Sequence, residues 1–190
     1  MTTLRNLLIA AGSAAVLASL ATTAAAQQST SSASATVGAS IIQPIAITKN
    51  NDVSFGTITR PNTATTSQVV LSTTNTTTPV SIVGGTALVQ AQGSRGQFTI
   101  TGDGGRAYTL SGSTTAFNLT GSGSASGQNI SFTPAFSVDS GSLSGTAGVL
   151  PGTQFTAATQ LLYAGGSFNV TNETTPGPYT GTMSLTVTYN

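Results

Sequence analysis

The end of the chain, Gly177–Asn190, alternates strictly between two kinds of side chain. From Tyr179 to Tyr189 every second residue is apolar or glycine, and the residues between them are all Thr or Ser. Because successive side chains leave a β-strand on opposite sides, this pattern predicts a strand with one buried and one wetted face. At about 3.3 Å per residue the strand would span roughly 35 Å, about twice the usual length. It ends the sequence, so we expect nothing downstream to pair with its second edge.

The N-terminus has the layout of a secretory signal peptide. Arg5 precedes an apolar run, Leu7–Leu20, and small residues end at Ala24–Ala26. This order predicts cleavage before Gln27, so we assign residues 1–26 to a signal that is removed on export. The alternative is a membrane anchor, but the run is shorter than the roughly 20 residues that span a bilayer, and no basic cluster follows it.

Charge is scarce in the predicted mature part, which has four basic and four acidic residues and no clusters. Such a surface cannot neutralise a phosphate backbone or hold an anionic membrane, so we expect neither nucleic acid nor membrane insertion. There is no Cys, and the fold must therefore hold without disulfides. The eight charged residues are Lys49, Arg60, Arg95, Arg106, Asp52, Asp103, Asp139 and Glu173.

Apolar residues recur in short period-two blocks along the rest of the chain, separated by Gly, Pro, Asn and Ser. About ten such blocks, with turn signals every 8–12 residues or so, predict an all-β sandwich or barrel. A disordered, mucin-like stalk would also be Thr-rich and weakly charged, but it would not need these blocks. No stretch outside the signal has a helical period with caps.

Three connections are predicted from local turn signals. Gly102–Gly105 separates the strands Gln97–Thr101 and Arg106–Ser111, which predicts a hairpin. Lys49–Asp52 is predicted to be a turn between two short strands. Gly141–Gly152 is rich in Gly and Ser and is predicted to be a loop.

The residues that usually carry catalysis are missing. There is no His and no Cys, which removes the commonest general base, a strong nucleophile and most transition-metal ligands. The four carboxylates are isolated in sequence, although two could still meet across a fold as in a hydrolase. Asp103 in GDGG resembles a fragment of a calcium loop but lacks the repeated acidic ligands, so we interpret it as a turn residue. We predict no enzyme, no cofactor and no metal site.

Three features coincide at the C-terminus: a penultimate Tyr189, Gly177 fourteenth from the end, and alternation between them. Together they resemble the C-terminal motif of chaperone–usher fimbrial subunits. Three longer segments resemble a secreted proteobacterial domain family of unknown function that is similar to Mat/common-type pilins, and they cover most of the mature chain. These segments are PIAITKNNDVSFGTI (Pro44–Ile58), GQFTITGDGGRAYTL (Gly96–Leu110) and LLYAGGSFNVTNETTPGPYTGTMSLTVTYN (Leu161–Asn190).

This resemblance implies an immunoglobulin-like Greek-key β-sandwich over residues 43–190 that lacks its last strand, preceded by an N-terminal extension, residues 27–42. The terminal strand would border an open groove, first covered by a periplasmic chaperone and later, at an outer-membrane usher, by the extension of the next subunit. Such head-to-tail contacts give filaments, so the implied function is a structural subunit of a surface fimbria with an adhesion or biofilm role. The groove residues would be Gly177, Met183, Leu185, Val187 and Tyr189, and the donor residues Ala33, Ala35, Val37, Ala39 and Ile41.

The sequence does not determine the register of the donor strand. Alanine side chains bring little apolar area, and at roughly 25 cal/mol/Å² they would contribute only a few kcal/mol. Backbone hydrogen bonds, at about 0.5–1.5 kcal/mol each, would contribute more.

Two alternative functions also stay open. One is a monomeric secreted β-sandwich that binds a glycan or another surface partner. The scarcity of aromatic side chains counts against glycan binding, because aromatic ring faces usually stack on sugars. The other is a self-complemented matrix or coat protein that needs no chaperone.

Overall fold

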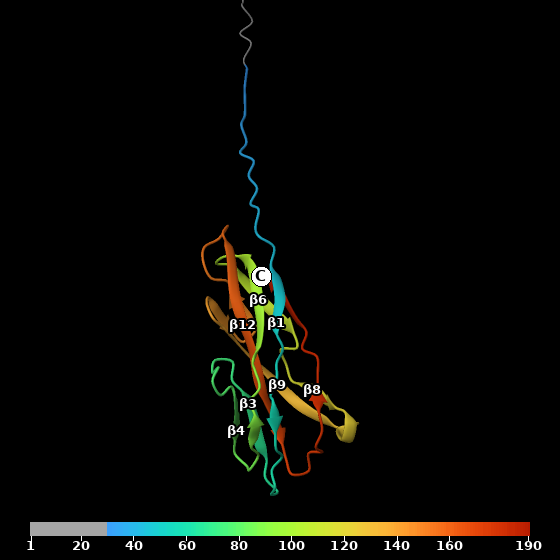
Figure 1. The fold of residues 1–190 in the computed structure, drawn as a ribbon. Coiled ribbons are helices and arrows are strands. Elements are labelled where there is room, and N and C mark those ends of the chain that lie inside the picture. The colour runs from blue at the N-terminus through green and yellow to red at the C-terminus, as the bar shows by residue number, and fades with distance from the viewer. Residues whose placement is uncertain (1–29) are drawn as a thin grey trace, which may run out of the picture. The chain divides into compact units, whose positions relative to one another are not determined.

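The computed structural model describes residues 30–190, and the predicted signal peptide lies outside this part of the chain. The chain divides into two units, Met1–Ala39 and Ser40–Asn190. In the first unit, residues 30–39 form no strand and are exposed to solvent. The second unit contains all the strands of the described chain (Figure 1).

The unit Ser40–Asn190 is all-β, as the period-two pattern predicts. It has fourteen strands and a single 3-10 turn, Gly123–Ala125. The strands are β1 (Ala46–Asn51), β2 (Thr57–Ile58), β3 (Ser67–Leu71), β4 (Val80–Val83), β5 (Val89–Ala91), β6 (Gly96–Asp103), β7 (Ala107–Gly112), β8 (Phe117–Gly121), β9 (Asn129–Val138), β10 (Ser142–Ser144), β11 (Ala147–Val149), β12 (Ala157–Val170), β13 (Tyr179–Thr180) and β14 (Leu185–Tyr189).

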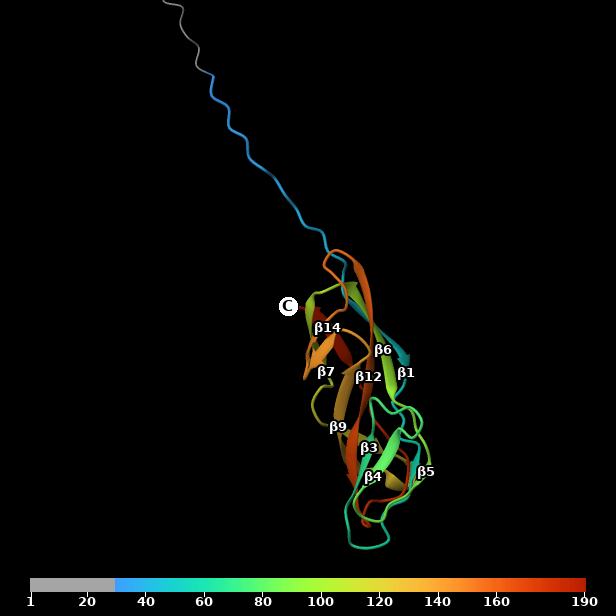
Figure 2. The same cartoon turned by 90° about the vertical axis from the view of Figure 1, so that its left-hand side faces the viewer.

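The long strand β12 organises the largest sheet. Its first part pairs with β6 and its last part with β3, while β9 pairs along the other edge. All these pairs are antiparallel, and β1, β4, β8 and β13 extend the sheet to eight strands. A second sheet has the order β10-β11-β7-β14, and β2 pairs with β5 in a third (Figure 2). Each sheet includes at least one pair of strands that are distant in sequence.

The core consists of two apolar clusters. The first lies between the β6–β12 part of the large sheet and the four-stranded sheet, and includes Ile100, Leu162 and Leu110. The second is centred on Val69 and Leu71 of β3. All five side chains are at most 1% exposed. Their burial follows the alternation of each strand, because every second residue faces the same side.

The predicted hairpin around Gly102–Gly105 is wrong. β6 pairs with β1 and β12, whereas β7 pairs with β11 and β14, so the two strands lie in different sheets. The connection instead bonds to another loop, because Gly104 N–H donates to Thr156 O and Gly105 N–H to Leu150 O. Turn residues show that a chain changes direction but do not specify the sheet that the next strand joins.

The turn predicted at Lys49–Asp52 is also wrong, because β1 continues through Lys49 to Asn51. The pairing with β6 shifts its register between Lys49 and Asn51, so the polar run makes an irregularity in the strand rather than a reversal. The expected second strand around Val53 and Phe55 is reduced to one bridge, between Ser54 and Ser94.

Two further predictions need correction. The predicted loop Gly141–Gly152 contains the hairpin β10–β11, whose short Ser- and Gly-rich strands lack an apolar pattern. The predicted long terminal strand is divided, because residues 181–184 between β13 and β14 belong to no strand. Its phase is as predicted: Met183, Leu185, Val187 and Tyr189 are each more buried than the Thr or Ser residues between them.

Candidate functional site

The terminal strand β14 lies at the edge of the four-stranded sheet and pairs with β7 alone. Ser184 O accepts a hydrogen bond from Ser113 N–H, and Asn190 N–H donates to Ala107 O. The backbone N–H and C=O groups of the even-numbered residues therefore point toward β7. In an antiparallel pair, alternate residues direct their backbone groups to opposite edges. The backbone groups of Leu185 and Val187 therefore face the other edge, where no strand of residues 30–190 pairs with them.

The segment just before β14 is also unpaired. Within the described chain, no backbone hydrogen bond involves Gly181, Thr182 or Met183. Gly181 lies close against β8, since a Cβ added there would come within 2.9 Å of Leu119 Cδ2. The chain from Gly181 to the end of β14 thus offers one long, open backbone edge.

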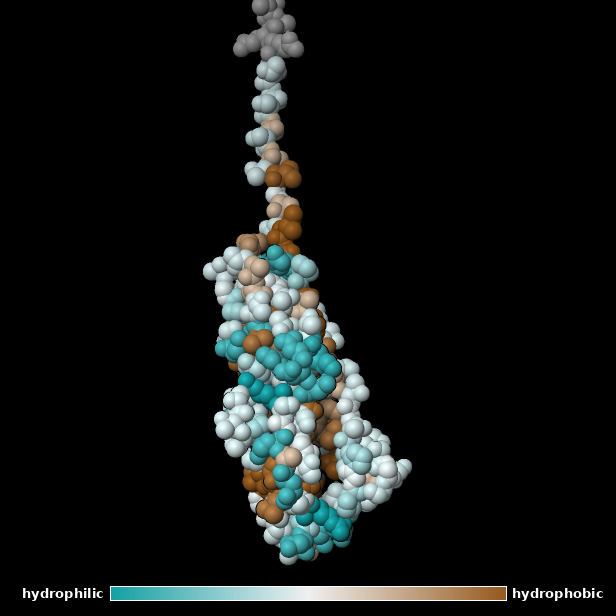
Figure 3. Space-filling model, viewed as in Figure 1, coloured by the Kyte–Doolittle hydropathy of each residue, from teal (hydrophilic) through white to brown (hydrophobic). Residues whose placement is uncertain are grey.

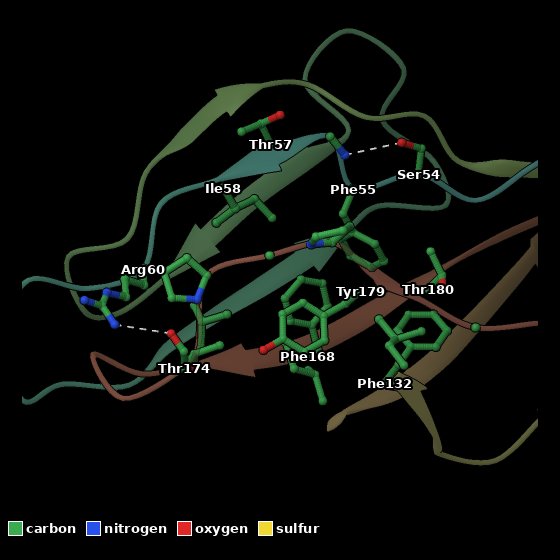
Figure 4. A pocket seen from close by; sticks show the side chains of 18 of the residues that line it. Ser54, Phe55, Thr57, Ile58, Arg60, Phe132, Phe168, Thr174, Tyr179 and Thr180 are labelled. Atoms are coloured by element: carbon green, nitrogen blue, oxygen red, sulfur yellow. Dashed lines mark hydrogen bonds between the residues drawn. The ribbon is translucent and has the colours of Figure 1, made fainter. Parts of the chain in front are cut away.

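An apolar groove of about 700 Å³ lies beside Gly181 and Met183. One wall is residues 53–60, and the other is residues 174–181 together with Met183 (Figure 4). Figure 3 shows the hollow with apolar residues exposed inside it. Its floor consists of inward-facing residues from three adjacent strands: Phe117 and Leu119 of β8, Ile130 and Phe132 of β9, and Phe168 and Val170 of β12.

Phenylalanine rings hold one wall of the groove to its floor. Phe55 packs edge-on against Phe168 at 4.7 Å between ring centroids and against Phe132 at 5.7 Å. Phe132 in turn packs edge-on against Phe117 at 5.2 Å. Each such pair contributes roughly 0.5–1.5 kcal/mol beyond its buried area, so the apolar floor keeps its shape without a ligand.

Two polar contacts brace the walls of the groove. Arg60 is the single charged residue among those that line it, and its guanidinium donates to Thr174 O at 3.4 Å, across the two walls (Figure 4). The Tyr179 hydroxyl donates to Thr175 O at 2.8 Å and so fixes the ring at the second wall. The groove therefore fits an uncharged, apolar occupant.

The five groove residues expected from the sequence fall into two groups. Gly177 and Met183 line the groove. Leu185 and Val187 pack into the first core cluster with β7. Tyr189 bonds at both ends of its hydroxyl: it accepts from Asp103 N–H at 2.5 Å and donates to Gln43 O at 2.9 Å.

The residues expected to donate a strand are exposed in the structure. Val37 is 94% exposed and Ile41 89%. Residues 30–45 form no strand and no β-bridge. The alternating apolar side chains Ala33, Ala35, Val37, Ala39 and Ile41 therefore have no strand partner among residues 30–190.

The sequence did not reveal the groove wall at residues 53–60 or the phenylalanine floor. Alternation in Asn129–Thr133 shows that Ile130 and Phe132 share a face, but it does not show whether a partner covers that face. The floor combines strands separated by up to fifty residues, and no local signal links them.

No group of three or more His, Cys, Asp or Glu residues within 30–190 is placed to hold a metal ion. In the same range, no helix is long and apolar enough to cross a membrane.

The fold and groove define an all-β protein with an unpaired C-terminal edge beside an apolar groove. The chain belongs to the family described as "Domain of unknown function (DUF4402)", whose model matches residues 45–189. The match spans β1 to the end of β14 and so includes both walls of the groove. No curated protein and no solved structure matches the chain significantly.

Proposed function

We propose that this protein is a structural subunit of a surface fimbria, assembled by donor-strand complementation and serving adhesion or biofilm formation. Its fold would be an immunoglobulin-like Greek-key β-sandwich that lacks its last strand. The observation that carries the proposal is the open backbone edge of residues 181–189, which continues from the wall of an apolar groove.

A donated strand would satisfy both parts of this site. Unpaired edges and exposed apolar surface both favour association with another chain. An added strand would bond to the free backbone groups of Met183, Leu185 and Val187, and its inward side chains would cover Phe132 and Phe168. Strand addition of this kind takes affinity from backbone bonds and specificity from alternate side chains.

The N-terminal extension is the occupant that the chain itself offers. Ala33–Ile41 would span about 30 Å when extended, at roughly 3.3 Å per residue. Val37 and Ile41 are four residues apart and so lie on one face of a strand, together with the alanines between and before them. Both are exposed, and neither has a partner in a strand of the described chain.

A second copy is a better source of this strand than the chain's own extension. The chain runs from β1 toward the groove wall at residues 53–60, so its own extension would have to reverse within Ile42–Ile45 to reach the groove. Pro44 restricts Gln43 to extended conformations, and Gln43 O is bonded to the Tyr189 hydroxyl. Both features oppose a tight reversal there. Donation to a neighbour is head-to-tail and produces an open filament.

The implied partners are further copies or related subunits, a periplasmic chaperone and an outer-membrane usher. An apolar groove with a free edge needs cover before assembly, and a chaperone strand would supply it. The protein would pass through the periplasm and end at the cell surface, in the fimbria or outside the cell.

The proposal is tested by adding a synthetic Gln27–Ile41 peptide to the exported chain, Gln27–Asn190, and measuring its melting temperature. Binding to the folded state alone stabilises by about 2.7 kcal/mol at a hundredfold excess over Kd, which raises Tm by several degrees. The control peptide has Val37→Asp and Ile41→Asp and should have no effect. A monomer whose Tm is high and indifferent to both peptides would contradict the proposal.

A matched pair of groove variants locates the binding. Met183→Glu places a charge in the groove and should abolish the peptide effect, whereas Thr182→Glu, on the exposed side of the same segment, should preserve it. Met183 is only partly buried, so the variant is expected to fold, and circular dichroism checks this. Equal peptide responses from the two variants would place the binding elsewhere.

A further inference from the structure

A second hollow, of about 450 Å³, is lined mainly by amide and hydroxyl side chains. It lies at the end of the large sheet where β3, β12 and β9 run side by side, next to residues 171–175. The polar residues that line it from the strands and the start of β9 are Gln68, Gln128, Asn129, Ser131, Thr133, Ser167 and Asn169.

Strand register brings these side chains to one face. Asn169 on β12 is directly opposite Gln68 on β3, and Ser167 is directly opposite Thr133 on β9. Opposite residues have Cβ atoms about 4.5–5.5 Å apart, and alternate residues along a strand share a face. The intervening Phe168 lines both this hollow and the apolar groove, so the two sites meet at this residue.

These seven polar side chains take no part in holding the fold together. Within residues 30–190, none of the seven side chains makes a hydrogen bond to another residue. By contrast, Thr171 and Thr174 at the rim bond to each other. Each free amide offers two donors and an acceptor, and each hydroxyl offers one donor and acceptor capacity.

The charge of the hollow restricts the ligand. Glu173 is the single charged residue among those that line it, so no cation is present to bind a phosphate, sulfate or carboxylate. Apolar surface comes from Ile130, Phe168 and Tyr179, whose ring is fixed by its bond to Thr175 O. Paired donors and acceptors beside an immobilised ring match the vicinal hydroxyls and apolar faces of a sugar.

We propose that this hollow, formed by Gln68, Asn169, Ser131 and their neighbours, binds a neutral saccharide. Its volume lies within the range of about 300–1,000 Å³ that is usual for small-ligand sites and accommodates one or two sugar units. The site would give the protein a contact with surface polysaccharide that is separate from strand addition.

The saccharide site and the groove share a wall, which restricts the choice of test variants. Ile130, Phe168, Thr174, Thr175 and Tyr179 line both (three of them are labelled in Figure 4). A substitution at any of these residues would disturb both sites. Asn169 and Gln68 line the polar hollow but not the groove, and both are exposed. Replacing them should therefore leave the fold and the groove intact.

The experiment titrates the exported chain with maltose, cellobiose, lactose and diacetylchitobiose, using chemical shifts or calorimetry. Glucose 6-sulfate and digalacturonic acid serve as anionic probes. We expect at least one neutral disaccharide to bind with Kd of about 1 mM or tighter, and more tightly than either anionic probe. Asn169→Ala and Gln68→Ala should each weaken binding about tenfold, because each removes direct hydrogen bonds.

The matched control is Asn50→Ala. Asn50 is an exposed asparagine on β1 of the same sheet and lies outside the hollow, so its replacement should leave saccharide binding unchanged. The proposal is overturned if none of the four neutral sugars binds at about 10 mM, if an anionic probe binds more tightly, or if both hollow variants bind like the control. The peptide experiment is independent of these outcomes, so a failure here does not affect the groove.

Discussion

The Tyr108 hydroxyl donates a hydrogen bond to Gln160 Oε1 at 2.6 Å, and both side chains are fully buried. Tyr108 belongs to β7 of the four-stranded sheet and Gln160 to β12 of the eight-stranded sheet. Gln160 Nε2 also donates to Ser140 O and Val149 O, on either side of the β10–β11 hairpin. One polar network therefore connects the two main sheets through the core.

This network predicts loss of stability at high pH. Burial raises the pKa of Tyr108 from 10.0 to about 12. The pKa of Tyr108 is thus higher in the folded state than in the unfolded state. Its contribution to the free energy of unfolding is therefore complete below pH 10 and is lost as the pH rises through about 12. The loss should amount to about 3 kcal/mol. Urea unfolding at a series of pH values from 8 to 12 measures it.

The control for this pH effect is Tyr108→Phe. The variant should lose the contribution of residue 108 to the pH dependence, and at pH 8 it should be about 1–3 kcal/mol less stable because Gln160 Oε1 loses its donor. An unchanged pH profile in the variant would assign the alkaline loss to other groups.

The Tyr108 ring also depends on Gly148, its direct neighbour on β11. A Cβ at position 148 would lie 2.2 Å from Tyr108 Cζ, well inside van der Waals contact. Gly148→Ala should therefore destabilise the unit by about 3 kcal/mol, since a buried ring has no room to move away. Thermal unfolding tests this. Gly38→Ala, with nothing within 4 Å of the added atom, should leave Tm unchanged.

The two ion pairs of the described chain should differ sharply in their contribution to the free energy of unfolding. Asp103 is fully buried and is paired with Arg106, whereas Lys49 and Asp52 are both exposed. Arg106→Ala would leave a buried carboxylate without its cation, at a cost of about 3 kcal/mol. Lys49→Ala should cost less than about 1 kcal/mol and lose that contribution in salt. Chemical denaturation of both variants makes the comparison, and equal losses would contradict it.

The proposed assembly predicts a variant that is stable but does not polymerise. Val37→Asp changes a side chain that is 94% exposed, so the Tm of the single subunit should stay the same. A charge at that position could not enter the apolar groove of a neighbour without a large desolvation cost, so filaments should be absent. Thr36→Asp, on the opposite face of an extended strand, is the matched control. Electron microscopy and sedimentation distinguish the two, and normal filaments from Val37→Asp would exclude this donor register.

Local patterns predicted much of the fold. The predicted strand Gln97–Thr101 lies within β6, and the predicted strand Arg106–Ser111 agrees with β7 to within one residue at either end. The inward phase of Met183, Leu185 and Val187 is also as predicted. These features depend on alternation within a few residues, which a strand imposes on its own sequence.

Pairing between distant strands could not be predicted in the same way. The Gly102–Gly105 connection has the residues of a hairpin, yet it passes between sheets, since β6 pairs with β1 and β12 whereas β7 pairs with β11 and β14. The strand β12 runs unbroken through Gly165 and Gly166, which pass close to the backbones of β3 and β9. A Cβ at Gly165 would come within 2.3 Å of Leu71 O, a constraint that exists only in the folded protein.

The sequence alone determined that this is an all-β chain, which residues of its last segment face inward, and that it contains no His and no Cys. Only the tertiary structure decided that Phe55, Phe132 and Phe168 meet in a groove and that, among residues 30–190, the final strand is paired on one edge alone. The reason is physical: side-chain alternation is a local property of a strand, whereas an open edge and the floor of a groove depend on which distant strands pair.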